Sequence, residues 1–281
     1  MSRQLEPYQQ IERSIQKTYH KRLWTPFITA VKQYDLIAPG DRIAACISGG
    51  KDSMLMAKLL QLLQRHSDVP FEVVYLVMDP GYNAANRQKI EYNAALLHIP
   101  VTIFSTDIFE ITSTAGQSPC YLCARMRRGY LYSKARELGC NKIALGHQRE
   151  DVMETFLLSL FHEGRISTFA PVTWLNRTDI VQIRPMIYVP AKRILSVVRE
   201  QRFPVQQAAC SAAGETRRED MREMLKAFNQ YQPNATELIF RAISHPESYG
   251  LWDKVKNRPE GLPDTRPRPA LETLFPRQQD E

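Results

Sequence analysis

The chain has 281 residues, 43% hydrophobic and 24% charged, which fits one large globular α/β domain with a substantial core. No run approaches the ~18 apolar residues of a membrane span, and the first ten residues lack the apolar core of a signal peptide, so we expect a soluble, cytoplasmic protein with no membrane partner. The net charge of +7 would attract a polyanion such as a nucleic acid, although a mildly basic enzyme without such a partner is the more frequent case.

From the amino terminus, apolar residues at helical spacing predict a helical segment over 8–36, which Pro26 kinks or restarts. Buried strands and helices then alternate. The predicted strands cover 42–48, 71–79, 101–106, 141–146 and 179–185. The predicted helices cover 52–64, 84–98, 123–138, 149–162 and 190–201, with charged helices following to about 245. This alternation predicts a doubly wound parallel sheet with helices on both faces.

Composition divides the chain into three parts. We expect a helical segment at 1–40, the α/β domain at 41–250, and a tail at 251–281 that is rich in proline and charge and is therefore largely disordered.

A glycine-rich segment, ISGGKDS at 47–53, joins the first predicted strand to the next helix. In a doubly wound sheet, ligands bind beyond the carboxyl ends of the strands. Two glycines let the backbone approach an anion, and serine hydroxyls, helix N–H groups and a lysine can hold phosphate. Ala45 and Asp52 exclude a Walker A loop. A plain Gly-Gly turn is the alternative, but phosphate binding is favoured. The predicted contacts are Ser48, Gly49, Gly50, Lys51, Asp52 and Ser53.

The five cysteines, at 46, 120, 123, 140 and 210, are an odd number, which argues against a disulfide framework. Cys46 and Cys140 lie in apolar contexts typical of buried thiols. Cys120 and Cys123 begin a helix, where two thiolates can face one metal, and Cys210 is the available third ligand. From the pair alone, a 4Fe–4S cluster, structural zinc, a redox pair and ordinary thiols stay about equally open.

Longer motifs favour one of these readings. SGGKDS resembles the Ser-Gly-Gly-x-Asp-Ser loop of N-type ATP pyrophosphatases. CYLCARMRRG at 120–129 resembles the Cys-x-x-Cys-x-Arg-x-Arg-Arg-Gly signature of the TtcA-type tRNA 2-thiocytidine synthases. ALGHQREDV at 144–152 and IRPMIY at 183–188 are also similar to stretches of that family, in the same order.

This resemblance implies an adenine nucleotide alpha hydrolase-like fold and an enzyme that uses ATP to adenylate a tRNA cytidine, at position 32, and to replace its O2 with sulfur. It implies a 4Fe–4S cluster on Cys120, Cys123 and Cys210, and Mg²⁺ with ATP in the loop. A cysteine desulfurase or another sulfide donor would be a partner, and a homodimer is possible.

The resemblance also assigns individual roles. Asp151, Glu150 and Lys51 are the expected catalytic residues. Asp79 and Gly146 are expected beside ATP, although Asp79 is as readily a turn residue. Arg125, Arg127 and Arg128 would contact tRNA or ATP phosphates, whereas His147 ranks low because a packed turn histidine is more common.

Two departures from the family pattern stand out: a single thiol, Cys210, where the family has a second Cys-x-x-Cys, and Glu150 in place of the first paired aspartate. Further candidates for an RNA surface are Lys17, Lys21, Arg22, Arg193, Arg217, Arg218 and Arg222.

Three other functions remain as alternatives. A related uridine thiolase would usually carry extra zinc-binding Cys/His clusters, and a lysidine-forming ligase would not need the three cysteines. A zinc-stabilised nucleic-acid-binding protein would share the cysteines but would not turn over ATP.

Overall fold

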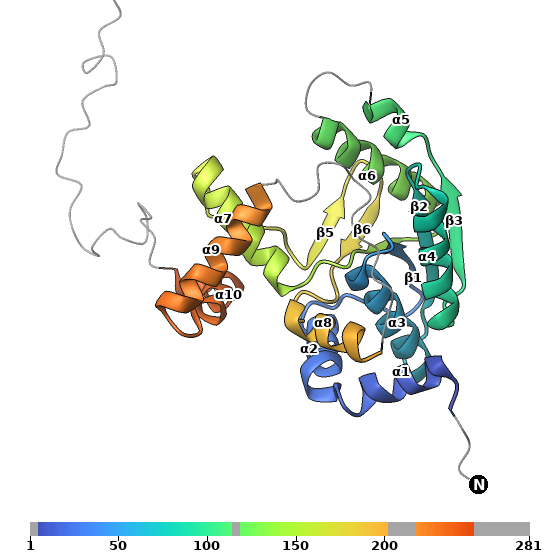
Figure 1. Cartoon of the computed structure of the whole chain (residues 1–281), viewed down its shortest axis with the longest axis horizontal. Coiled ribbons are helices and arrows are strands. Elements are labelled where there is room, and N and C mark those ends of the chain that lie inside the picture. Colours follow the sequence, from blue (N-terminus) through green and yellow to red (C-terminus); the bar gives the residue numbers. More distant parts are fainter. Residues whose placement is uncertain (1–4, 114–118, 202–216, 250–281) are drawn as a thin grey trace, which may run out of the picture. The chain divides into compact units, whose positions relative to one another are not determined.

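A computed structural model describes residues 5–113, 119–201 and 217–249 (Figure 1). Its centre is a six-stranded sheet in the order β3-β2-β1-β4-β6-β5. The strands are β1 (Arg42–Ile47), β2 (Glu72–Asp79), β3 (Val101–Ser105), β4 (Lys142–Ala144), β5 (Val172–Leu175) and β6 (Ile180–Ile183). All neighbouring strands pair in parallel except β5, which runs antiparallel to β6 at the edge.

The helices follow the predicted alternation. They are α1 (Pro7–Gln16), π-helical η1 (His20–Trp24), α2 (Thr25–Gln33), α3 (Lys51–His66), α4 (Ala84–Leu96), α5 (Ile108–Ser113), α6 (Pro119–Glu137), α7 (Arg149–Glu163), α8 (Ala191–Glu200), α9 (Arg217–Tyr231), α10 (Ala235–Ser244) and 3-10 helical η2 (Pro246–Ser248). Within the described residues, no helix is both long and apolar enough to cross a bilayer.

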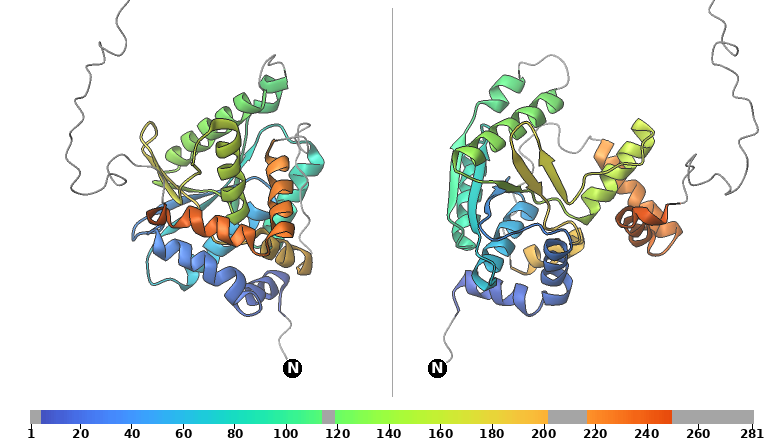
Figure 2. Two further views of the ribbon diagram at one scale, coloured as in Figure 1. Left: turned by 90° about the vertical axis from the view of Figure 1, so that its left-hand side faces the viewer. Right: turned by 180° about the vertical axis from the view of Figure 1, so that it is seen from behind.

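Alternate residues of β1 enter two hydrophobic cores. Ile43, Ala45 and Ile47 pack with α3, α8 and the amino-terminal helices, whereas Ala44 and Cys46 pack with residues of α6. Both faces of β1 are therefore buried, which explains its unbroken apolar sequence. Figures 1 and 2 show helices on both faces of the sheet, which confirms the doubly wound α/β prediction.

The strand order places a topological switch between β1 and β4. From β1 the sheet continues outward to β2 and β3, whereas β4 lies on the opposite side of β1. Crossovers on opposite faces leave a crevice at the carboxyl ends of these two strands. The glycine-rich loop and the loop that carries Gly146 both begin there.

Several predictions need correction or completion. The sequence did not indicate β5 or α5, and β5 makes the sheet mixed where an all-parallel one was expected. Strand β5 is short, and its residues alternate between exposed and half-buried, so it lacks the hydrophobic run by which the other strands were recognised. The restart at Pro26 is confirmed, because Pro26 lies in the first turn of α2.

Domain boundaries stay a prediction. The chain divides into a unit of residues 1–240, which holds the sheet, and a unit from Arg241 onward. The amino-terminal helices contribute Ile11, Ile15, Leu23 and Phe27 to the core beneath β1. The predicted tail at 251–281 lies outside the described residues.

A buried ion pair joins α1 to α3. The ammonium of Lys58 is fully buried and lies 2.5 Å from Oε1 of Glu12, and it also donates to Gln61 Oε1 and to the Leu97 carbonyl. Glu12 also pairs with Arg65. Removing one member of a buried pair leaves the other charge without compensation.

We therefore predict that Glu12→Gln lowers the free energy of unfolding by about 3 kcal/mol, measured by urea denaturation. The control is Glu72→Gln, which breaks the exposed pair with Arg42 and should change stability by less than about 1 kcal/mol. Equal effects of the two changes would show that the buried pair does not anchor α1.

Candidate functional site

The conformation of the glycine-rich loop is fixed by hydrogen bonds of its own serine side chains. Ser48 N–H donates to Ser53 Oγ at 3.1 Å, and Ser53 Oγ donates to the Gly50 carbonyl at 2.9 Å. Gly49 has a φ of +84°, a conformation that favours glycine. No side chain of the described residues caps the first turn of α3, so its N–H groups can bind an anion at the loop.

Gly146 fits closely against this loop. A Cβ atom on Gly146 would lie 3.0 Å from both the Cα and the N of Ser53. Only hydrogen fits there, so the chain after β4 can press directly on the start of α3. Gly146 is thus a spacing residue for the loop, a role that explains its requirement without any ligand.

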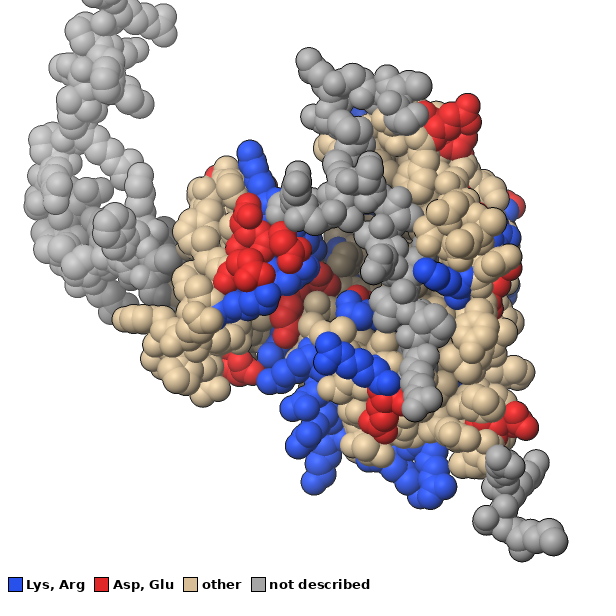
Figure 3. All heavy atoms as spheres, in the orientation of Figure 1, with Lys and Arg blue, Asp and Glu red and all other residues tan. Residues whose placement is uncertain are grey.

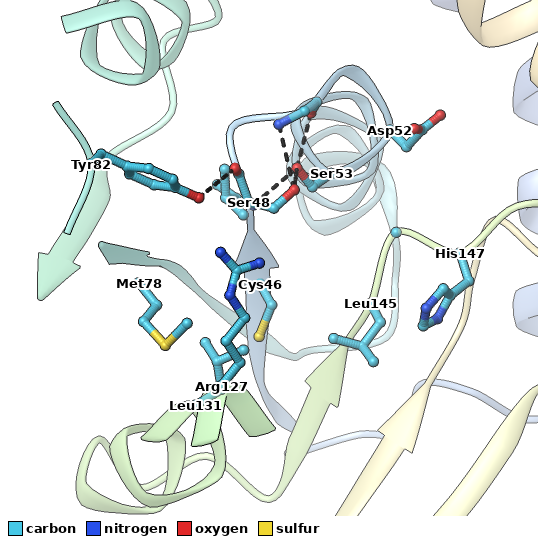
Figure 4. Close-up of a pocket in the computed structure, with 13 residues that line it drawn as sticks. Cys46, Ser48, Asp52, Ser53, Met78, Tyr82, Arg127, Leu131, Leu145 and His147 are labelled. Atoms are coloured by element: carbon cyan, nitrogen blue, oxygen red, sulfur yellow. Dashed lines mark hydrogen bonds between the residues drawn. The ribbon is translucent and has the colours of Figure 1, made fainter. Parts of the chain in front are cut away.

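A cavity of about 280 Å³ opens beside the loop (Figure 4). Ser48, Gly50, Asp52 and Ser53 line it from the loop side, and Gly146 and His147 line it from the end of β4. Its remaining walls are Cys46, Ile47, Met78, Tyr82, Arg127, Leu131 and Leu145. The mixture of an anion-binding loop with apolar walls is typical of a nucleotide pocket.

Helix α6 brings the cysteine motif to the same cavity. Arg127 and Leu131 line the cavity, and Cys123 lies one turn before Arg127 on the same face of the helix. Burial raises the pKa of Tyr82; the Arg127 guanidinium opposes this shift, whereas the Asp79 and Cys123 charges add to it. Cys123 therefore lies within electrostatic range of a residue that lines the cavity.

The other predicted ligands are less fully placed. Cys120 is in the first turn of α6, but its side chain is not described, and Cys210 lies outside the described residues. Within the described part of the chain, no three His, Cys, Asp or Glu side chains gather as a metal site. The three-cysteine ligand set therefore stays a prediction.

The three arginines of α6 separate into two kinds. Arg127 is half-buried, lies over the Phe109 ring and points toward the glycine-rich loop in Figure 4. Arg125 and Arg128 are exposed. Cys46 and Cys140 are buried as predicted, and burial raises the pKa of both thiols.

Two predicted carboxylates meet at the end of the loop. Burial raises the pKa of Asp52; its partner Lys51, at 2.8 Å, opposes this shift, and the nearby Asp151 charge adds to it. Oδ1 of Asp52 is buried without a hydrogen-bond partner among the described residues. Asp151 accepts from the Gln148 N–H and lies 3.4 Å from Arg218.

The predicted catalytic role of Glu150 stays untested, and the structure shows a local contact of its carboxylate. Its Oε2 accepts the N–H of Ala191 at 2.8 Å, so the carboxylate caps the amino terminus of α8. Burial raises the pKa of Glu150, and this hydrogen bond opposes the shift. The geometry accounts for Glu150 as a structural cap.

Asp79 is also held locally. Its Oδ1 accepts the N–H groups of Gly81 and Tyr82, and its Oδ2 pairs with Arg87 at 3.0 Å. Burial acts against these contacts, but together they lower the pKa of the carboxyl. The turn interpretation explains Asp79, and its predicted contact with ATP stays untested.

His147, which the sequence ranked low, lines the cavity and packs against Phe169, with ring centroids 4.8 Å apart and the rings tilted by 34°. Burial, helped by the positive charges of Arg184 and Arg218, lowers its pKa to about 4. The imidazole is therefore neutral at pH 7.

Sequence reasoning missed three residues of the site. Glu154 is 1% exposed and pairs with Arg222 at 3.0 Å. The Tyr82 hydroxyl donates to the Ser48 carbonyl, and the Phe169 ring packs against His147. The sequence holds a signal only for Glu154, which follows Asp151 by three residues and so shares its helix face.

Comparisons with known proteins agree with this geometry. The PP-loop domain family matches residues 7–227, so the chain belongs to the PP-loop proteins. The fold resembles that of the U34-tRNA thiolase NcsA from Methanococcus maripaludis, solved with its [4Fe-4S] cluster. That match has a TM-score of 0.64 at 18% identity and covers 80% of this chain and 78% of the other.

Curated relatives show which family of PP-loop proteins the chain belongs to. Over 234 residues the chain is 36% identical to the tRNA-cytidine(32) 2-sulfurtransferase of Citrifermentans bemidjiense, covering 82% of this chain and 92% of that protein. Over 266 residues it is 34% identical to the protein of the same name from Alkalilimnicola ehrlichii, covering 92% and 85%. The chain is a member of the tRNA-cytidine(32) 2-sulfurtransferase family.

We predict that Gly146→Ala weakens ATP binding at least 10-fold, because the new Cβ would displace the backbone at Ser53. Isothermal titration calorimetry measures this affinity. Gly129→Ala in α6 is the control, since nothing lies within 4 Å of a Cβ there and ATP affinity should stay unchanged. ATP binding of normal strength in Gly146→Ala would contradict the spacing role.

His147 should make stability depend on pH. An unfolded chain protonates this histidine near pH 6.5, whereas the folded chain keeps it neutral down to about pH 4. Between these values the unfolded state binds more protons, so stability falls as the pH falls. The free energy of unfolding should fall between pH 7 and pH 5 in both proteins. We predict that this fall is about 2 kcal/mol smaller in His147→Phe than in the wild type, measured by urea denaturation. Parallel losses in the two proteins would refute this assignment.

Proposed function

We propose that this chain is an ATP-dependent tRNA sulfurtransferase that converts cytidine 32 to 2-thiocytidine. The observation that carries the proposal is the sharing of one cavity by the glycine-rich loop and helix α6. Arg127, one turn after Cys123, lines that cavity together with Ser48, Gly50 and Ser53. Relatives that are named for this reaction, at 34–36% identity over most of the chain, support the same substrate.

The loop residues would bind ATP by its phosphates. Ser48, Gly49, Gly50 and Ser53, with the free N–H groups of α3, form an anion cradle, and Lys51 adds positive charge. Mg²⁺ is commonly bound by one or two carboxylates together with substrate phosphates. Asp52, with its unpartnered Oδ1, and the adjacent Asp151 suit that role.

The chemistry would proceed in two displacements. Cytosine O2 attacks the α-phosphorus of ATP, an O–P bond forms, and pyrophosphate leaves. A sulfur nucleophile then forms a bond to C2 as the C2–O bond breaks and AMP departs. Arg127 extends from α6 toward the glycine-rich loop. Its positive charge can therefore stabilise the pyrophosphate and the AMP that leave in the two steps.

The position of Cys123 supports an iron–sulfur cluster near the cavity. Cys123 is a half-buried free thiol on the cavity side of α6, and Cys120 occupies the first turn of the same helix. Cys120, Cys123 and Cys210 would hold the 4Fe–4S cluster. When bound through three thiolates, such a cluster leaves one iron for the sulfur that replaces O2. A cysteine desulfurase or another donor would supply that sulfide.

Nucleoside mass spectrometry of tRNA tests the proposal in a strain that lacks the gene. We predict that 2-thiocytidine disappears, returns with the wild-type gene, and stays absent with Cys123→Ala. Cys140→Ala is the matched control, because this thiol is buried in the core below β4, and it should restore the nucleoside.

The same spectra separate the alternatives. Loss of a thiolated uridine with 2-thiocytidine intact would identify a uridine thiolase. An unchanged tRNA profile, together with zinc and no iron in protein purified without oxygen, would identify the nucleic-acid-binding alternative. Either result would overturn the proposed function.

A further inference from the structure

A group of cationic side chains covers η1 and α8 beside the site; we call it the α8 surface. It consists of Lys21, Arg22, Lys192, Arg193 and Arg199. Arg193 is half-buried and the other four are exposed. None of them forms an ion pair with a described residue, although the charge of Lys192 acts on the Glu237 carboxylate and the charges of Arg22 and Arg193 act on the Tyr19 hydroxyl. Figure 3 shows Lys and Arg gathered over this region.

The two helices bring their charges to one place. Burial and the hydrogen bond that Tyr19 donates to Glu200 raise the pKa of Tyr19 to about 12, while Arg193 and Arg22 act in the opposite direction. Helices η1 and α8 are also in contact, and the hydrogen bond from Tyr19 to Glu200 joins the residue before η1 to the end of α8. The cations of the two helices therefore lie close together, with the Glu200 carboxylate beside them.

The α8 surface also reaches the glycine-rich loop. Lys192 lines a second cavity, of about 740 Å³, together with Lys51 of that loop. From Lys192 to Arg199, α8 extends about 10 Å away from the cavity. A polyanion on this surface would run directly toward the loop.

On the opposite rim of this cavity the positive charges are paired with carboxylates. Arg218 and Arg222 of α9, which the sequence suggested for RNA, are neutralised by Asp151, Glu154 and Glu219. Acidic side chains gather over α7 and α9 in Figure 3. On this rim the charges of Arg218 and Arg222 are therefore matched by carboxylates, whereas those of the α8 surface form no ion pair with a described residue.

We propose that the α8 surface binds the tRNA phosphate backbone that flanks the base entering the cavity; this inference rests on the proposed function. Unpaired Lys and Arg next to a catalytic pocket fit phosphodiesters, whose binding is mainly electrostatic.

The test compares two double variants by full-length tRNA binding over a series of salt concentrations. Arg22→Gln with Lys192→Gln removes two charges of the α8 surface. Lys89→Gln with Arg136→Gln removes two exposed charges that have no ion pair with a described residue, from α4 and α6. We expect the first variant to lose at least 10-fold in affinity and its salt slope to become shallower by about 2. The control should stay within about 2-fold, and both variants should keep ATP affinity.

Wild-type tRNA affinity and salt slope in the first variant would overturn the inference. So would normal tRNA binding with impaired binding of a sulfide-donor protein, because the surface would then belong to that protein. Weakened tRNA binding in the variant, with an unchanged nucleoside profile in the deletion strain, would support the surface and refute only the proposed reaction. Loss of 2-thiocytidine in the deletion strain, together with normal tRNA binding by the variant, would support the proposed reaction and refute the role of the α8 surface.

Discussion

The close approach of two backbone segments, at Gly146 and at Ser53, positions the rest of the site. A Cβ on Gly146 would lie 3.0 Å from main-chain atoms of Ser53, so the chains that leave β4 and β1 lie in direct contact. Parallel strands permit this because both carboxyl ends meet at the same sheet edge. The contact brings the start of α3 beside the start of α7, and it thereby makes Asp52 and Asp151 neighbours. The anion-binding loop and the carboxylates can then act on one ligand.

Charge around this contact is unevenly shared. Asp52, Glu150 and Glu154 are buried enough that desolvation raises the pKa of each. Arginines of α9 offset that cost for Glu154, and Arg218 also pairs with Asp151, so α9 contributes to the site although it follows in the chain long after the sheet is complete. Because those arginines are used internally, the free positive charge of the opening lies on α8 and η1. The electrostatic potential beside the cavity therefore differs between the α8 side and the α9 side. The total charge of the chain does not reveal this difference.

Local patterns in the sequence predicted most of the fold. The alternation of buried strands and helices was enough for β1 to β4, β6 and the helices between them, because each carries its own hydrophobic signal. Strand β5 lacks such a signal, since it forms only by pairing with β6 at the edge. For the site, the motif predicted phosphate contacts for three arginines; Arg127 alone of the three lines the described cavity beside the loop, and the contacts themselves stay a prediction. The sequence could not show that Glu150 reaches Ala191, which is 41 residues away in the chain, or that Arg218 pairs with Asp151, because both contacts depend on the folded path of the chain.

The cap formed by Glu150 has a consequence for how related chains can differ. The family pattern has aspartate there, and aspartate is one methylene too short to reach the Ala191 N–H if the backbone keeps its present position. A relative with aspartate must bring α8 nearer or satisfy that N–H in another way. A change of the residue at 150 therefore requires a change in the turn that precedes α8. Since α8 carries Lys192 and Arg199, the length of this one side chain also affects the position of a cationic helix relative to the glycine-rich loop.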